Sequence, residues 1–241
     1  MTVMMSLAHR LRTSRLYLCT DARERQGDLA DFVGAAFAGG VDIVQIRQKN
    51  MSRDAELAAL EVARGAAAAT QGIVCVNDSP RLAQAFAADM LHLGQTDGPA
   101  KRARRSLHAW ALVGRSTHTP EQVDEAAADA DVSYFAVGPV HATPTKPDYV
   151  PVGLDLVRYA ARVAPVGDVG SKPWFAIGGL DADNLDQVIE AGARRVVVVR
   201  AITQASDPEA AARVLKNRLR QAWASDPSLA SYALRSAALE A

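Results

Sequence analysis

Eight short apolar segments recur along the chain from Arg15 onward, and alanine-rich segments separate them. The apolar segments are near-continuous rather than alternating, which is typical of parallel strands covered on both faces. We predict strands at residues 16–20, 42–47, 72–77, 90–94, 111–116, 134–140, 174–178 and 195–201. We predict helices at residues 29–38, 53–70, 80–88, 122–130, 154–163, 182–191 and 208–224, and a basic segment at 100–106 that is compatible with a helix.

This alternation predicts an α/β protein, a (β/α)8 TIM barrel in a single domain. A doubly wound open sheet is the rival architecture, but eight consecutive strand–helix units at a spacing of roughly 25 residues favour closure. Thr119-Pro120 is one of several helix-start signals between the strands. We expect a frayed, flexible N-terminus at residues 1–14, the barrel at 15–224 and a C-terminal tail at 225–241 that is either marginally helical or disordered.

The charge balance and the cysteine content exclude several classes of protein. Among 241 residues, 27 basic and 27 acidic side chains cancel, which argues against nucleic acid or an anionic membrane as a partner. Cys19 and Cys75 are too few for a disulfide framework and lack metal-ligand spacing, so we expect buried thiols in a reducing cytoplasm. No apolar run approaches the roughly 18 residues of a membrane span. The sequence leaves the oligomeric state open, a homo-oligomer included.

Barrel enzymes place their sites at the C-terminal ends of the strands, and polar residues gather at those positions here. Gln45, Arg47 and Lys49 end the second strand and share one face, because side chains alternate along a strand. Two cations beside an amide suit a polyanion such as a diphosphate. A salt bridge at the barrel mouth is the alternative, since inward-facing charges need partners.

Two carboxylates follow the third and fourth strands. Asp78 comes after the neutral Asn77, and Asp97 ends the next strand-loop segment. Beside a cationic cluster, such a pair is suited to Mg²⁺, which takes one or two carboxylates and completes its shell with substrate phosphate and water. Asp78 is also a candidate helix cap. We expect His92 to pack as a neutral core residue rather than as a metal ligand.

The loop after the sixth strand carries Thr143, Pro144, Thr145 and Lys146. Two hydroxyls and an ammonium suit phosphate oxygens, because the hydroxyls direct hydrogen bonds and the lysine adds a point charge. An ordinary surface loop with a solvated lysine is the alternative, since these residue types are common in loops.

Three further strand ends carry candidate ligands for phosphate. Ser116 ends the fifth strand, where a hydroxyl suits a phosphate or a ring nitrogen, and the nearby His118 is either a general base or a structural residue. Gly178-Gly179 after the seventh strand lets backbone N–H groups approach a phosphate, although a plain turn explains paired glycines equally. Together with Val199-Arg200 after the eighth strand, this turn predicts a second anion site opposite the first.

Taken in order, the segments QIRQK, VND, HLGQTD, GRSTH, VGPVHATPTK and AIGG resemble the thiamine-phosphate synthase family, over about residues 15–219. The family joins hydroxymethylpyrimidine diphosphate to hydroxyethylthiazole phosphate and releases pyrophosphate. The resemblance implies a transferase of thiamine biosynthesis whose diphosphate leaves first, with its charge spread by Mg²⁺ and cationic side chains. It also implies one Mg²⁺ ion per site, held by Asp78 and Asp97.

The resemblance further implies which residues bind each substrate. The expected catalytic residues are Arg47, Lys49, Ser116 and Lys146. The pyrimidine diphosphate would be bound by Gln45, Ile46, Arg47, Gln48, Lys49, Asn77, Ser116 and Lys146. The thiazole phosphate would be bound by Thr143, Pro144, Thr145, Gly178, Gly179, Val199 and Arg200.

Three residues depart from the family pattern. Gln48 stands where an acid is common and should matter little if it faces outward, and His141 replaces an apolar or aromatic residue near the ring. Arg200 replaces a common serine, so we expect the phosphate pocket to persist with altered geometry.

Two other functions are weighed against coupling of the two substrates. A thiazole tautomerase-like relative shares the barrel, but Pro139 stands where that relative carries a histidine. A catalytically silent ligand-binding barrel would be expected to lack the metal carboxylates, whereas Asp78 and Asp97 are both present. Turnover and its dependence on Mg²⁺ separate these alternatives from a synthase.

Overall fold

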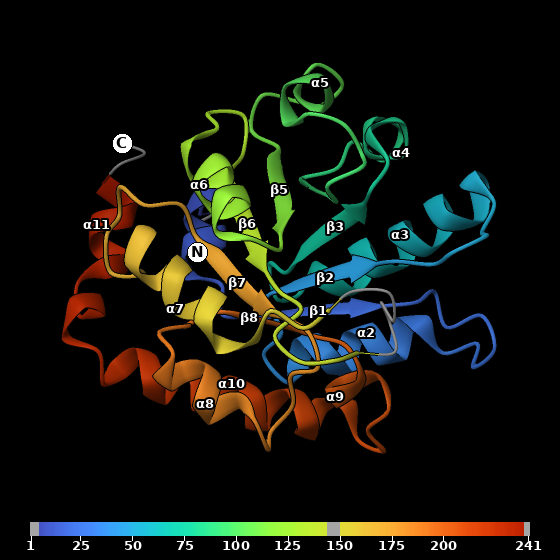
Figure 1. Cartoon of the computed structure of the whole chain (residues 1–241). Coiled ribbons are helices and arrows are strands. Elements are labelled where there is room, and N and C mark those ends of the chain that lie inside the picture. Colours follow the sequence, from blue (N-terminus) through green and yellow to red (C-terminus); the bar gives the residue numbers. More distant parts are fainter. Residues whose placement is uncertain (1–4, 144–149, 239–241) are drawn as a thin grey trace.

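The described residues form eight parallel strands that close into a barrel in the computed structural model, which describes residues 5–143 and 150–238. The strands are β1 Leu16–Thr20, β2 Ile43–Ile46, β3 Ile73–Asn77, β4 Met90–Leu93, β5 Leu112–Thr117, β6 Tyr134–Val137, β7 Trp174–Ile177 and β8 Val196–Val198. Each strand pairs with the next in sequence, and β8 pairs with β1 (Figure 1). The predicted (β/α)8 barrel is therefore confirmed, and the rival doubly wound open sheet is wrong.

Helices follow the strands and cover the outside of the barrel (Figure 1). They are α2 Leu29–Ala38, α3 Arg53–Ala67, α4 Pro80–Phe86, α5 Ala100–Arg104, α6 Pro120–Ala128, α7 Gly153–Val163, α8 Leu185–Glu190, α9 Arg200–Thr203 and α10 Pro208–Ala224. The last strand is shorter than predicted, because the backbone turns at Val199 and α9 begins at Arg200. A continuous apolar run cannot mark this change from strand to helix.

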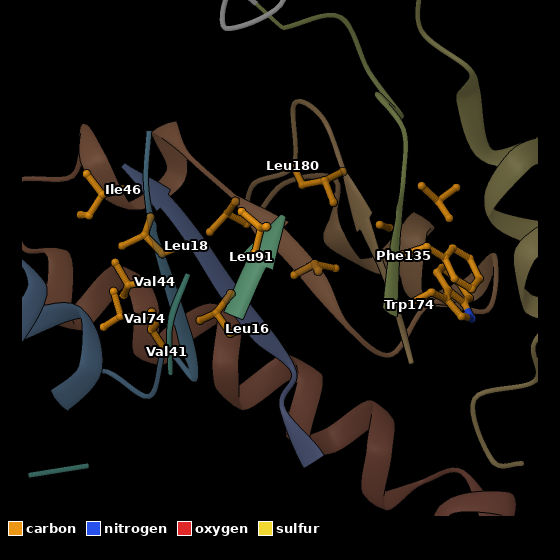
Figure 2. Close-up of a cluster of buried hydrophobic side chains, with 14 of the residues drawn as sticks. Leu16, Leu18, Val41, Val44, Ile46, Val74, Leu91, Phe135, Trp174 and Leu180 are labelled. Atoms are coloured by element: carbon orange, nitrogen blue, oxygen red, sulfur yellow. The ribbon is translucent and has the colours of Figure 1, made fainter. Parts of the chain in front are cut away.

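Side chains that alternate along each strand build two separate cores. The outward-facing set includes Leu16, Leu18, Val44, Ile46 and Val74, which are buried between the strands and the helices (Figure 2). This layer explains why the strands are apolar on both faces, since the barrel interior supplies the second core.

The second core fills the barrel interior with aromatic rings. Tyr17 packs edge-on against Phe175 at a centroid distance of 5.6 Å, and Tyr134 packs against the same ring at 5.9 Å. All three are buried. These rings fill the barrel interior, and sites in such barrels lie at the C-terminal ends of the strands.

The first and the last helix that the structure describes pack against each other near the start of β8. Helix α1, Leu7–Thr13, contacts helix α11, Tyr232–Ala238, and the Ser236 hydroxyl lies 3.1 Å from His9 Nδ1. Leu11 of α1 is buried in the interior core. The prediction of a frayed N-terminus is therefore wrong for Leu7–Thr13, which forms a helix that packs against the barrel. A helix of this length is too short to show a periodic apolar pattern in the sequence.

The C-terminal segment is helical over the part that the structure describes. After a 3-10 turn at Pro227–Leu229, α11 packs the buried Tyr232 edge-on against Trp223, with ring centroids 5.6 Å apart. Arg195, also buried, donates hydrogen bonds to the Arg12 carbonyl and the Tyr232 hydroxyl. None of the described helices is both long and apolar enough to cross a membrane.

Candidate active site

A cavity of about 510 Å³ opens at the C-terminal ends of the strands. Twelve of the residues predicted to form the site line it together, and they come from six different strand ends and from the loop after β6. These residues are Gln45, Arg47, Lys49, Asn77, Asp78, Asp97, Ser116, Thr143, Gly178, Gly179, Val199 and Arg200. The barrel thus gathers residues that the sequence spreads over more than half of its length.

Two predicted residues lie away from this cavity. Ile46 is buried in the outer core, because strand alternation turns it away from Gln45 and Arg47. Gln48 points to the loop after β1, where its Oε1 accepts a hydrogen bond from the Ala22 N–H at 3.1 Å. We therefore withdraw both side chains from the substrate-binding set. Three other predicted residues, Pro144, Thr145 and Lys146, lie outside the described residues.

The cations after β2, Arg47 and Lys49, line the cavity. Within residues 5–143 and 150–238, neither Arg47 nor Lys49 has a carboxylate oxygen within 4.0 Å. The Arg47 backbone is fixed by a hydrogen bond to the Thr20 carbonyl at 2.8 Å. The barrel-mouth salt bridge considered above is thus absent from the described part of the chain, and both charges are available to an anionic ligand.

Asp78 and Asp97 form a carboxylate pair at the ends of β3 and β4. Ser79, not Asp78, caps helix α4, and its hydroxyl accepts a hydrogen bond from the Leu82 N–H at 3.2 Å. Asp78 has a left-handed backbone, φ 58°, and its N–H donates to the His92 carbonyl. The predicted cap role therefore belongs to Ser79, which leaves the Asp78 carboxyl directed at the cavity.

The carboxylate pair has the electrostatics of a cation site. Burial and the adjacent Asp97 carboxyl raise the pKa of Asp78 to about 6. The described part of the chain contains no group of three or more histidine, cysteine, aspartate or glutamate side chains that could hold a metal. Two carboxylates with a neighbouring anion-binding cluster fit Mg²⁺, whose remaining ligands are usually substrate phosphate and water.

Polar side chains also line the floor of the cavity. Gln45 Nε2 donates to the Tyr17 hydroxyl at 2.7 Å, and Cys19 lies beside Gln45 Oε1 at 3.3 Å. His92 lies 2.9 Å from both the Ser116 and the Tyr134 hydroxyls. We predicted His92 as a core residue, whereas it lines the cavity. Its position two residues after Met90, an inward-facing residue, is the sequence signal that identifies it as inward-facing too.

The glycine turn after β7 packs against the loop after β6. Gly178 and Gly179 both have positive φ, at 112° and 64°. A Cβ added to Gly178 would lie 2.5 Å from Pro139 Cα, and one added to Gly179 would lie 2.8 Å from His141 Cβ. Close approach of the two loops therefore requires these glycines. It also brings Thr143 to the same cavity as the turn.

His118 reaches the cavity but is held by the backbone. Its ring Nδ1 contacts the Gly138 carbonyl, and its backbone N–H donates to Gln122 Oε1 at 2.7 Å. These contacts favour a structural role for His118 over a role as general base. Arg200, which begins α9, lines the same cavity as the glycine turn.

Comparison with known proteins identifies the family that this chain matches. Residues 16–202 match the family model described as "Thiamine monophosphate synthase". The thiamine-phosphate synthase of Thermobifida fusca is 54% identical over 214 residues, which cover 89% of this chain and 96% of that protein. The thiamine-phosphate synthase of Streptomyces avermitilis is 53% identical over 213 residues, which cover 88% of this chain and 97% of that one.

A solved structure gives the same answer for the fold. The thiamine phosphate pyrophosphorylase of Pyrococcus furiosus superposes with a TM-score of 0.76 and 25% sequence identity. The superposition covers 90% of this chain and 99% of that one. The barrel and its chain order therefore agree with a solved relative over nearly the whole length of both chains.

Proposed function

The chain belongs to the thiamine monophosphate synthase family and is a transferase of thiamine biosynthesis, a thiamine-phosphate synthase. From this premise we propose that it condenses 4-amino-2-methyl-5-hydroxymethylpyrimidine diphosphate with 4-methyl-5-(2-hydroxyethyl)thiazole phosphate. The products are thiamine phosphate and pyrophosphate. The observation that supports the proposal is the one cavity lined together by two cations without an ion-pair partner among the described residues, a carboxylate pair and a glycine turn.

The pyrimidine diphosphate binds between β2 and β5. Arg47 and Lys49 contact the diphosphate, where a guanidinium fork and an ammonium suit phosphate oxygens. Gln45, Asn77 and Ser116 contact the pyrimidine, whose ring nitrogens and amino group match amide and hydroxyl partners. This assignment is supported by their shared cavity and by the absence of competing ion pairs within the described residues.

Asp78 and Asp97 would hold one Mg²⁺ ion, because one or two carboxylates beside a substrate phosphate suit this ion. When bound, the ion neutralises part of the charge on the departing pyrophosphate. The raised pKa of Asp78 supports this role, because two adjacent carboxylates are ionised together only at a cost that a cation removes.

The thiazole phosphate binds across the cavity at the turn after β7 and the start of α9. Gly179 brings backbone close to the phosphate, Arg200 supplies a positive charge, and Thr143 supplies a hydroxyl from the loop after β6. Loops after the seventh and eighth strands are the usual phosphate site of these barrels. In this proposal, the thiazole ring and the pyrimidine share one cavity, which Ser116 also lines.

The reaction needs positioning and electrostatics more than a strong base. The bond between the hydroxymethyl carbon and the diphosphate oxygen breaks, and its electron pair leaves with pyrophosphate. The ring-stabilised cation that remains is captured by the lone pair of the thiazole nitrogen, which forms the new C–N bond. Arg47 and Lys49 stabilise the charge that develops on the leaving group. No nucleophilic side chain takes part in this sequence of steps.

The test is formation of thiamine phosphate from the two substrates, with and without Mg²⁺. We expect Mg²⁺-dependent product in the wild type and at least a hundredfold lower kcat/KM in Asp78→Asn. Gln48→Ala is the matched control, since this side chain faces outward, and it should retain activity. Isomerisation of the thiazole without coupling would instead identify a tautomerase. Binding of both substrates without turnover would identify a ligand-binding barrel.

A further inference from the structure

Three side chains from neighbouring strands form a hydrogen-bonded row on the cavity floor. His92 on β4 has Nε2 2.9 Å from Ser116 Oγ on β5 and Nδ1 2.9 Å from Tyr134 Oη on β6. Ser116 and His92 line the cavity, whereas Tyr134 is fully buried beneath them. The row therefore runs from the barrel interior to a residue that faces the substrate.

The proton of the Tyr134 phenol fixes the direction of this row. Burial raises the pKa of Tyr134 well above its ordinary value, so the phenol is neutral and has one proton to donate. Its other polar neighbours are the Cys75 sulfur at 3.9 Å, a weak acceptor at a long distance, and the Tyr17 hydroxyl, which lowers the pKa of Tyr134 as a hydrogen-bond donor does. His92 Nδ1, at 2.9 Å, is the better acceptor.

A neutral imidazole that accepts at Nδ1 carries its proton on Nε2. Nε2–H then donates to Ser116 Oγ, which occupies a lone pair of that oxygen and leaves the serine proton directed elsewhere. The Ser116 side chain lines the cavity, so its hydroxyl is oriented to donate to a ligand acceptor there.

We propose that His92 is a positioning residue which, held by Tyr134, fixes the Ser116 hydroxyl as a hydrogen-bond donor to a ring nitrogen of the pyrimidine. This inference rests on the proposed function for the identity of the ring. In this role, His92 on β4 and Tyr134 on β6 act on the substrate through Ser116. A freely rotating serine would have to be ordered at each turnover, whereas the row orders it in advance.

A double-mutant cycle between Tyr134 and Ser116 tests the coupling. Tyr134→Phe keeps the ring and removes the hydroxyl, and we expect about 3- to 10-fold lower kcat/KM for the pyrimidine diphosphate, the worth of one hydrogen bond. In a Ser116→Ala background, the same change should have no further effect. The KM for thiazole phosphate should stay within about twofold in all variants.

Two additional variants separate positioning from folding. Tyr232→Phe removes another buried hydroxyl, at the opposite end of the barrel, and should leave kcat/KM unchanged. His92→Gln can still donate an N–H to Ser116 and should retain more activity than His92→Leu at equal thermal stability. Equal losses in His92→Gln and His92→Leu would contradict the positioning role.

The tautomer supplies a readout independent of turnover. Two-bond ¹⁵N–¹H correlations of the wild type at pH 8 should show His92 protonated at Nε2, and the signal should change in Tyr134→Phe. Protonation at Nδ1, or additive effects in the cycle, would overturn the inference while leaving the synthase function intact. Absence of thiamine phosphate from the wild type would instead overturn the proposed function.

Discussion

Gly114 on β5 leaves the space that the Tyr134 ring occupies on β6. The two residues are register partners, and a Cβ added at Gly114 would lie 2.0 Å from Tyr134 Cζ. The hydroxyl of the same ring lies 2.9 Å from His92 Nδ1 at the cavity floor. Packing of the barrel interior and geometry of the site therefore depend on one pair of residues.

Gly114→Ala should both destabilise the barrel and impair the site. The added methyl must displace a fully buried ring, and overpacking of this kind costs about 1–3 kcal/mol. We expect a lower urea midpoint and a lower kcat, because the displaced Tyr134 no longer holds His92. Urea unfolding and steady-state kinetics on the same preparation measure the two effects.

Gly65→Ala is the matched control for this substitution. Gly65 lies on the exposed side of α3, and a Cβ added there meets no atom within 4 Å. Alanine in an exposed helix interior should raise stability by about 0.5–1 kcal/mol. Equal effects of the two alanines would mean that loss of glycine flexibility, not the contact with Tyr134, controls stability.

The barrel could be predicted from the sequence because each strand carries its own signal. Continuous apolar runs mark β1 to β7 to within a few residues. Helix α1 has no such run of apolar residues. Its contacts are with segments that are distant in the sequence. His9 and Ser236, for example, are 227 positions apart in the chain. A segment whose partners are so distant cannot be recognised from its local pattern.

The site could be predicted where alternation along a strand decides which side chains face inward. Gln45 and Arg47 line the cavity, whereas Ile46 between them does not. The role of Asp78 was harder to predict from the sequence, because Ser79 caps helix α4 and the backbone at Asp78 has a positive φ. Neither feature can be read from residue types alone.

Arg47 and Gln48 are adjacent in sequence but face different environments. Arg47 lines the cavity, and Gln48 contacts the loop after β1. Arg47→Ala should reduce kcat/KM for the pyrimidine diphosphate at least a hundredfold, because a charge that stabilises the leaving group is lost. Gln48→Ala should change it by less than threefold. Comparable losses in the two variants would place the diphosphate elsewhere.

Arg200 should control the affinity for thiazole phosphate. Arg200 lines the same cavity as the glycine turn, and a guanidinium suits a phosphate. Arg200→Ala should raise the KM for thiazole phosphate about 10-fold or more and leave the KM for pyrimidine diphosphate nearly unchanged. Steady-state kinetics with each substrate varied in turn measures both constants. An unchanged KM for thiazole phosphate would remove Arg200 from this site.

The carboxylate pair should make stability depend on pH when no metal is bound. The pKa of Asp78 is raised in the folded protein from its ordinary 3.8 to about 6. Its stability contribution is therefore fully present below pH 3.8 and is lost as the pH rises through about 6, where the Asp78 carboxyl ionises. Relative to Asp78→Asn, metal-free wild type should lose thermal stability between pH 4 and 6.5. Thermal melts of both proteins across this range measure the difference.

Mg²⁺ should reverse this loss if it binds as proposed, because the ion would compensate the charge of the ionised Asp78 carboxylate. At pH 7.5, above the raised pKa of Asp78, its carboxyl is ionised, so added Mg²⁺ and pyrophosphate should raise the melting temperature of the wild type. At pH 5 the ion must displace a proton from Asp78, so the same additions should give a smaller increase. Asp78→Asn should show little increase at either pH. An equal increase at both pH values, or in the variant, would mean that the ion binds away from Asp78 and Asp97.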